Sequence, residues 1–120
     1  MKKLLPLGVT GFRITPFVRA KDEQPKWLDT PGMADMWTTG SETRQAMCLL
    51  INPSDLPAAD AMCGKHPDTP VVIDHFARVG ADSEIRDDDV TALCKLARHK
   101  HAHVKVSAFY ALGKKKPPYD

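Results

Sequence analysis

The sequence has no long hydrophobic run and no strong excess of either charge. No apolar stretch approaches the ~18 residues that a membrane span requires. Pro6 and Gly8 end the apolar run behind the first two lysines too early for a signal peptide. With 17 basic and 15 acidic residues the net charge is +2, which favours neither nucleic acid nor a membrane as the main partner. We therefore expect a cytoplasmic protein.

Cysteine pairs and a glycine-rich phosphate loop are also missing. The three cysteines, Cys48, Cys63 and Cys94, form no C-x-x-C motif and lie in apolar surroundings, so we expect reduced thiols in a core. No predicted strand ends in G-x-G-x-x-G, which disfavours a dinucleotide-binding sheet. The short basic run 114–116 is interpreted as a solvated loop.

What the sequence does contain is an alternation of strands and helices. Runs rich in β-branched and other apolar residues predict four strands, which are residues 9–14, 46–52, 71–75 and 104–109. Apolar periodicity predicts three helices between them. This order is typical of parallel strands joined by right-handed crossovers. The predicted fold class is α/β, a partial (β/α)8 barrel of about four parallel strands that forms one domain, 1–120.

The helix boundaries follow from capping signals. Thr30 followed by Pro31 predicts the start of the first helix, and Gly40 its end. The second helix is expected to begin near Asp55. The third, 88–99, carries the apolar stripe Val90, Leu93, Cys94 and Ala97. The segment 16–29 is predicted to be a loop.

Length limits how much of a barrel this chain can form. A complete (β/α)8 barrel needs about 250 residues, or about 200 at the low end. With 120 residues, the chain accounts for about half of one. A flavodoxin-like binding module is an alternative, and helices on both faces of an open sheet would favour it.

His75 is the candidate catalytic residue, because it closes the apolar strand 71–75. Functional side chains of parallel α/β folds lie at the carboxyl ends of strands. A neutral imidazole there can transfer protons or bind a metal. A structural histidine held by a carboxylate is the alternative. If His75 points into the barrel, side-chain alternation places Val71 and Ile73 there too, and directs Asp74 toward the helices.

Other polar residues at the predicted strand ends are candidates for substrate binding. Arg13 could hold a substrate carboxylate through two hydrogen bonds, or form a structural ion pair. Lys105 shares a strand face with Ser107 but could also pair within the barrel wall. Tyr110 could bind or pack. The candidate substrate-binding residues are Arg13, Asn52, Lys105, Ser107 and Tyr110.

Alternating histidines at 99, 101 and 103 have a spacing that can chelate zinc. They precede the last predicted strand, so we place them at the amino end of the sheet, opposite the expected site. A helix end and surface turn is the favoured interpretation.

Three segments together resemble the amidohydrolase-related family. They are GVTGFRI (8–14), PVVIDHF (70–76) and VKVS (104–107), in this order. The resemblance runs through nearly the whole chain. The family comprises metal-dependent hydrolases of (β/α)8-barrel fold, with a branch of lactone and dicarboxylate-pyrone hydrolases. A VVIDH strand followed about thirty residues later by VKVS is the most specific element.

The resemblance implies that the four strands are the third to sixth of eight. His75 then takes the family's histidine position at the end of the fifth strand, which is a metal-ligand or substrate-contact position. Arg13 and the stretch after Ser107 match regions where relatives can hold anionic groups. Relatives often have glycine after the serine, where this chain has Ala108.

The implied activity is hydrolysis of a C–N or lactone C–O bond of a small molecule. The full-length family implies a divalent metal of zinc or manganese type. No tightly bound metal is expected here, because the family's first-strand His-x-His and last-strand aspartate have no counterpart. The chain is expected to be inactive alone, either as part of a longer protein or as half of an assembled barrel. A non-catalytic half-barrel that self-associates through its open edges is the alternative.

Overall fold

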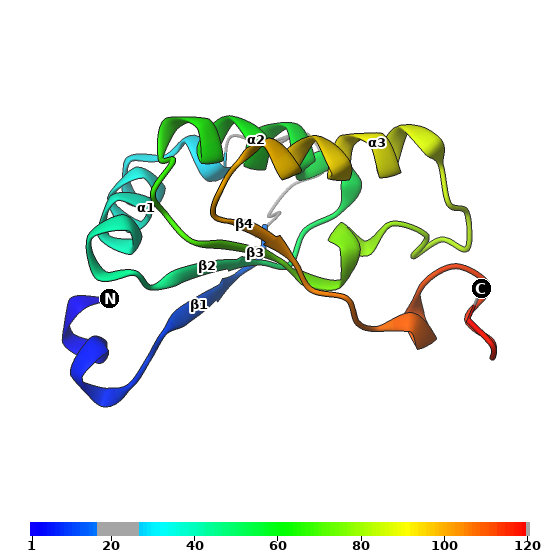
Figure 1. The fold of residues 1–120 in the computed structure, drawn as a ribbon, viewed down its shortest axis with the longest axis horizontal. Coiled ribbons are helices and arrows are strands. Elements are labelled where there is room, and N and C mark those ends of the chain that lie inside the picture. The colour runs from blue at the N-terminus through cyan, green and yellow to red at the C-terminus, as the bar shows by residue number, and fades with distance from the viewer. Residues whose placement is uncertain (17–26, 120) are drawn as a thin grey trace.

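A single parallel sheet organises the protein. The computed structural model describes residues 1–16 and 27–119 (Figure 1). The strands run in the order β1-β2-β3-β4, and every neighbouring pair is parallel. The elements are β1 Gly11–Ile14, α1 Pro31–Thr43, β2 Ala46–Leu49, α2 Leu56–Lys65, β3 Val71–Ile73, α3 Asp87–Lys95 and β4 Ala102–Val104. The α/β fold with four parallel strands and intervening helices is therefore confirmed.

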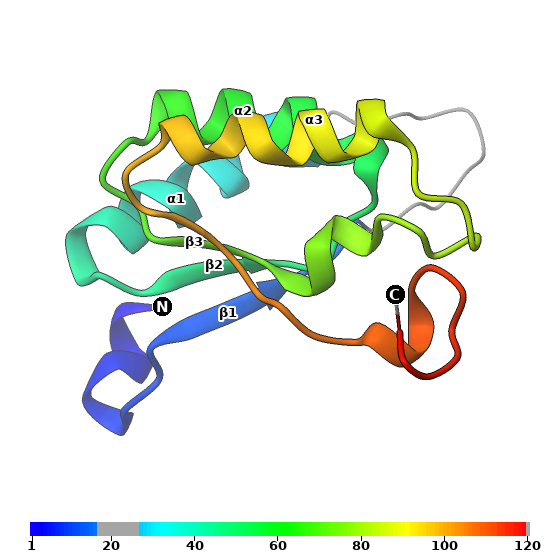
Figure 2. The same ribbon diagram turned by 45° about the vertical axis from the view of Figure 1, so that its right-hand side comes forward.

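The three helices α1, α2 and α3 cover one face of the sheet, as Figure 2 shows. Within the described ranges, no α-helix covers the opposite face, which we call the open face. A flavodoxin-like module would have helices on both faces. One-sided coverage and sequential strand order are instead what a segment of a (β/α)8 barrel has, since its helices form an outer ring.

The core lies between the sheet and these helices. Side chains of β2 and β3 meet the buried Trp37 of α1 and the inward face of α2. The second helix buries the four residues expected from its periodicity, which are Leu56, Ala59, Met62 and Cys63. From the sheet, Met47, Leu49, Val71 and Ile73 are each no more than 1% exposed.

The first helix begins as predicted but ends later. The hydroxyl oxygen of Thr30 accepts a hydrogen bond from the Met33 N–H at 3.3 Å, and Pro31 occupies the first turn. The expected end at Gly40 is wrong, because the helix continues to Thr43 and stops at Arg44, with φ 59°. A Cβ on Gly40 would lie 2.9 Å from the Gln45 carbonyl oxygen. This glycine therefore permits close packing.

The apolar stripe expected on the third helix is wrong in part. Cys94 and Ala97 are exposed, and Val90 is 39% exposed. The helix packs inward through Leu96, with Ala92 and Leu93 partly buried against the core. The reason is that Ala92, Leu93 and Leu96 share one face of the helix, which is rotated from the predicted stripe and has only Leu93 in common with it. The remaining stripe residues face away from the core.

The cysteines are free thiols in three environments. Cys63 is buried, Cys48 is partly buried and Cys94 is exposed, so the expectation of a core position is wrong for Cys94. Burial raises the pKa of the Cys63 thiol to about 11, with the negative charge of Asp60 adding to the effect.

Several predicted strands are shorter in the structure. The segment Lys2–Leu7 is a 3-10 helix that ends at Gly8 with φ 81°, and β1 starts only at Gly11. At the other end, β3 stops at Ile73, two residues before His75. Of the predicted loop 16–29, residues 17–26 lie outside the described residues. In the described part of the chain, no helix is long and apolar enough to span a membrane.

Candidate functional site

A buried carboxylate lies between two cations on the open face of the sheet. Arg13 Nε is 2.9 Å from Asp74 Oδ2, and Lys105 Nζ is 3.8 Å from Asp74 Oδ1. The Asp74 side chain is 3% exposed, whereas those of Arg13 and Lys105 are 56% and 48% exposed. We call these three residues the charged cluster. It joins β1, β3 and β4 at their carboxyl ends.

The contact between Arg13 and Asp74 is an ion pair without hydrogen-bond alignment. Oδ2 of Asp74 is buried and has no hydrogen-bond partner among the described residues, although the guanidinium Nε is close. The attraction is therefore mainly electrostatic, and water around the half-exposed Arg13 screens part of it. The two ends of the guanidinium, Nη1 and Nη2, make no ion pair or hydrogen bond within the described residues.

The expected direction of side chains on β3 is corrected by this cluster. Val71 and Ile73 face the helices, because they pack in the core with residues of α1 and α2. Side chains alternate along a strand. Val72 and Asp74 therefore face the open side, together with Cys48 and Arg13, which lie in register with Val72 across β2 and β1. Asp74 is therefore the side chain by which this strand end contacts the two cations on the open face.

Cys48 lies near this cluster on the open face. Burial raises the pKa of its thiol, and the negative charge of Asp74 adds to the rise. The positive charges of Arg13 and Lys105 act in the opposite direction but do not outweigh these effects. The thiol therefore stays protonated near neutral pH and is not an activated nucleophile.

His75 lies just beyond β3 and contacts Ser107, another of the candidate site residues. Its Nδ1 is 2.8 Å from the Ser107 Oγ, and the hydroxyl donates or accepts depending on the imidazole tautomer. Ser107 follows the end of β4, so two neighbouring strand ends supply this pair. The contact fixes the ring and leaves Nε2 without a hydrogen-bond partner among the described residues. The arrangement suits a histidine that exchanges protons through Nε2.

The backbone at His75 is in an unusual conformation. Four consecutive residues, His75, Phe76, Ala77 and Arg78, have φ between 52° and 58°. This left-handed turn costs about 1–2 kcal/mol for each residue that carries a Cβ. Left-handed runs of this kind persist only where the surroundings hold them, and such strain is concentrated at functional sites. The buried Asp74 precedes the turn, and buried Ala77 anchors it in the core.

The structure does not bring Asn52 or Tyr110 into the charged cluster. The Asn52 backbone N–H donates to Asp55 Oδ2 at 3.0 Å, so the residue caps the short turn Pro53–Asp55. Tyr110 is 74% exposed, in the turn Phe109–Ala111. Their proposed contact with substrate remains a prediction.

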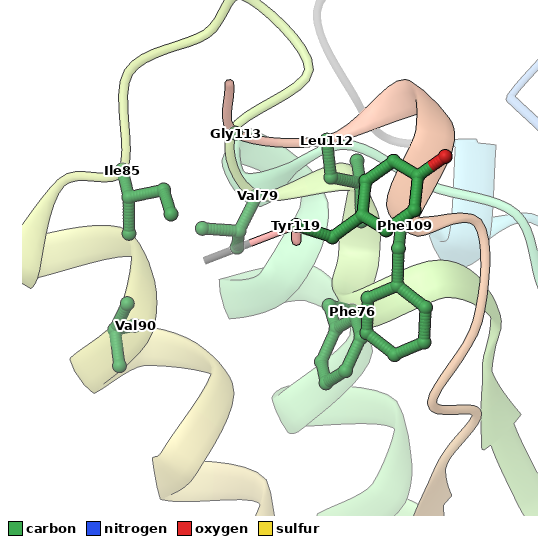
Figure 3. A pocket seen from close by; sticks show the side chains of 8 residues that line it. All are labelled: Phe76, Val79, Ile85, Val90, Phe109, Leu112, Gly113 and Tyr119. Atoms are coloured by element: carbon green, nitrogen blue, oxygen red, sulfur yellow. The ribbon is translucent and has the colours of Figure 1, made fainter. Parts of the chain in front are cut away.

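An apolar pocket of about 240 Å³ lies beside the His75 turn. Side chains from three segments point into one space, as Figure 3 shows. Phe76 and Phe109 pack with their ring centroids 5.9 Å apart. Two contacts hold the segment after β4 in place, from Gly113 N–H and Lys115 Nζ to the carbonyl oxygens of Gly80 and Ala81. The remaining lining residues are Val79, Ile85, Val90, Leu112 and Tyr119.

The last strand begins earlier than predicted, so His103 lies within β4 and only His99 and His101 precede it. His99 has a structural role. His99 Nε2 is 2.6 Å from Asp60 Oδ1, and Arg98 pairs with the same carboxylate. In residues 1–16 and 27–119, no three histidine, cysteine, aspartate or glutamate side chains come together as metal ligands. His75 has Ser107 at Nδ1, and Asp74 pairs with two cations. The described residues therefore do not fit a divalent metal by themselves.

Asp74 is not among the candidate site residues predicted from the sequence, although the structure places it between two of them. The available signal was a cation near the carboxyl end of the first strand and another just after the fourth, which are Arg13 and Lys105. Asp74, directly after β3, is the acidic residue that both cations reach. We assigned its direction from an assumed inward His75, and the left-handed turn removes that assumption.

Comparison with solved structures places this fold among hydrolases. A probable 2-pyrone-4,6-dicarboxylic acid hydrolase from Acinetobacter baumannii, with citric acid bound, is 27% identical with a TM-score of 0.76. The match covers 98% of this chain and 42% of that protein. An amidohydrolase from Burkholderia multivorans with bound HEPES matches 88% of this chain and 38% of its own, with 22% identity and a TM-score of 0.70. No family model matches the chain, and no curated protein matches it.

These matches confirm the resemblance to amidohydrolase-type hydrolases. The second match, at 22% identity, shows the fold alone. The chain spans 38–42% of the length of these two proteins. The structure is thus that of part of a TIM barrel.

Proposed function

We propose that this chain supplies part of the active site of a hydrolase that cleaves a C–N or lactone C–O bond in a small, carboxylate-bearing molecule. The charged cluster carries this proposal. It presents two half-exposed cations, Arg13 and Lys105, at the carboxyl edge of a parallel sheet, where barrel enzymes bind their substrates.

The two cations are suited to bind substrate carboxylates. Asp74 contacts Arg13 through Nε, which leaves both Nη atoms available for a bidentate interaction with a carboxylate. Lys105 provides a second positive charge nearby. The similar Acinetobacter protein is described as a dicarboxylic acid hydrolase and has citric acid bound, which supports a substrate with more than one carboxylate.

His75 is the proposed acid–base residue. Lactone hydrolysis adds water to the carbonyl carbon, breaks the ring C–O bond and gives a proton to the leaving oxygen. The Ser107 contact at Nδ1 orients the ring, so that Nε2 can take a proton from water and return it to the leaving group. The resemblance implies a divalent metal that would activate this water. We derive no step through it, because the described residues do not fit a metal by themselves.

The 120-residue chain alone is expected to have no measurable turnover. Catalytic groups of a (β/α)8 barrel come from the ends of several of its eight strands. This chain contributes four strands to such an edge. Measurable hydrolysis of a lactone dicarboxylate by the pure chain would contradict this expectation.

Citrate binding tests the proposed site without requiring turnover. Isothermal titration calorimetry with citrate is expected to show binding that weakens at least tenfold in Arg13→Met and in Lys105→Met. Lys3→Met is the matched control, because Lys3 is an exposed cation before β1, away from the carboxyl edge. Equal citrate affinity in all four proteins would overturn the assignment of these cations to a carboxylate site.

A further inference from the structure

Asp74 holds two cations that come from different strands. Arg13 lies in register with Cys48 on β2, so its side chain has to cross β2 to reach Asp74, which is roughly 10 Å or two strand spacings away. Lys105 lies on the other side of Asp74, because its backbone N–H donates to the Ile73 carbonyl oxygen at 2.8 Å. One carboxylate therefore fixes both positive charges, Arg13 at Oδ2 and Lys105 at Oδ1.

Asp74 is also the contact that orders these two cations. In residues 1–16 and 27–119, neither Arg13 nor Lys105 makes another ion pair or side-chain hydrogen bond. Long cationic side chains lose much conformational freedom when they are ordered. Without Asp74, a ligand would have to order both side chains as it binds, and this would lower its affinity. Asp74 therefore pre-organises the cations before a ligand arrives.

The negative charge of Asp74 would by itself weaken the binding of an anion. Two cations and one carboxylate give the cluster a net charge of +1, and a neutral side chain in place of Asp74 would raise it to +2. A buried carboxylate is also costly to keep in a fold. A site that needed only positive charge would therefore bind anions better without Asp74. Its place between the cations indicates a role in their geometry.

We propose that Asp74 is a positioning residue that makes the site prefer ligands with two or more carboxylates to ligands with one. This inference rests on the proposed function, in which Arg13 and Lys105 bind substrate carboxylates. Held at different oxygens of Asp74, the two cations can each pair with a different carboxylate of one ligand. The second contact then forms within an existing complex and needs no further loss of translational freedom. A ligand with a single carboxylate lacks this second contact.

Citrate and acetate measure this preference, because they carry three carboxylates and one. Calorimetry gives the citrate affinity of the wild-type chain and of Asp74→Asn, and NMR chemical-shift titration gives the acetate affinity. In Asp74→Asn, citrate binding is expected to weaken at least tenfold although the cluster becomes more positive, because the cations are no longer held together. Acetate binding should stay equal or tighten, because acetate needs only one cation. The ratio of the two affinities should therefore fall at least tenfold.

A merely structural role for Asp74 would leave this ratio unchanged. Partial unfolding lowers the apparent affinities for citrate and acetate by the same factor. Asp68→Asn is the matched control, because Asp68 is exposed in the turn before β3, at the amino end of the sheet. It makes the same change of net charge away from the charged cluster. The control should keep the wild-type ratio.

Arg13→Lys tests the arrangement without changing Asp74, and it decides the question if Asp74→Asn does not fold. The variant keeps the positive charge. One ammonium group, however, replaces a guanidinium that contacts Asp74 through Nε and can offer both Nη atoms to a ligand. Citrate binding should weaken at least tenfold, and acetate binding should change much less.

The possible failures of these experiments are distinguishable. A wild-type chain that does not bind citrate would overturn the proposed function and this inference with it. Citrate binding that depends on Arg13 and Lys105 but is tighter in Asp74→Asn would overturn the role of Asp74 alone. So would a citrate-to-acetate ratio that stays at the wild-type value in folded Asp74→Asn or in Arg13→Lys.

Discussion

Removing one partner of the charged cluster is expected to affect stability asymmetrically. In Arg13→Met the carboxylate of Asp74 stays buried at 3% exposure, with only Lys105 at 3.8 Å to compensate it. In Asp74→Asn the charges left behind belong to Arg13 and Lys105, which are half-exposed and can be solvated by water. A buried uncompensated charge is much costlier than an exposed one.

The magnitudes follow from these exposures. Loss of Arg13 should lower the free energy of unfolding by about 2–4 kcal/mol, because Lys105 offsets part of the usual penalty for an unpaired buried charge. Asp74→Asn should lower it by about 1–2 kcal/mol, the loss of charge-assisted contacts to partly solvated groups. The double variant Arg13→Met/Asp74→Asn should lie close to Asp74→Asn alone, because the buried charge is gone.

Urea unfolding at one fixed protein concentration measures the difference. With a denaturant slope of about 1–3 kcal/mol per molar urea, the midpoint of Arg13→Met should lie clearly below that of Asp74→Asn. Fixed concentration matters because self-association would shift the apparent midpoint. A midpoint for Asp74→Asn as low as that of Arg13→Met, or lower, would refute the assignment of Asp74 as the buried member of the cluster.

Three further outcomes are expected from the fold. In urea unfolding, Gly40→Ala should destabilise the protein by about 1–3 kcal/mol, because the added Cβ would lie 2.9 Å from a backbone oxygen. Gly32→Ala is the control, since Gly32 has open space around it, and it should be neutral or stabilise by up to about 1 kcal/mol. Thr30→Ala should cost about 1 kcal/mol in the same assay through loss of the helix cap, and an unchanged midpoint would contradict that role. Iodoacetamide labelling of dilute protein, followed by mass spectrometry, should modify exposed Cys94 first and Cys63 last, because a pKa of about 11 against an ordinary 9.0 lowers the thiolate fraction of Cys63 about a hundredfold; equal rates would contradict this order.

The sequence predicted the parts of the fold that depend on local signals. The order of strands and helices follows from apolar periodicity, and the start of α1 from Thr30 and Pro31. Gly40 shows where local signals mislead, since a glycine typical of a helix end is required there for contact with Gln45. The added Cβ would also lie 3.1 Å from Thr69, so the need for this glycine is set partly by a residue far away in the sequence.

Among the candidate site residues, the structure shows which side chains come together, and their roles stay predictions. His75 and Ser107 meet, as residues from two neighbouring strand ends can. The role of Asp74 could not be found from alternation along β3, because alternation gives two faces and does not say which one the helices cover. The exposure of the apolar residues on the outward side of α3 could not be predicted for a similar reason. An apolar stripe predicts burial but does not identify the surface that buries it.

At the left-handed turn after β3, the four consecutive residues 74–77 each enter a different environment. Asp74 enters the charged cluster, His75 contacts Ser107, Phe76 lines the apolar pocket and Ala77 fills the core. Inserting or deleting one residue in this stretch would place each later side chain of the stretch in the environment that suits its neighbour. The stretch can therefore vary in side-chain identity but not in length, and its length is the property that natural variants of this protein should keep fixed.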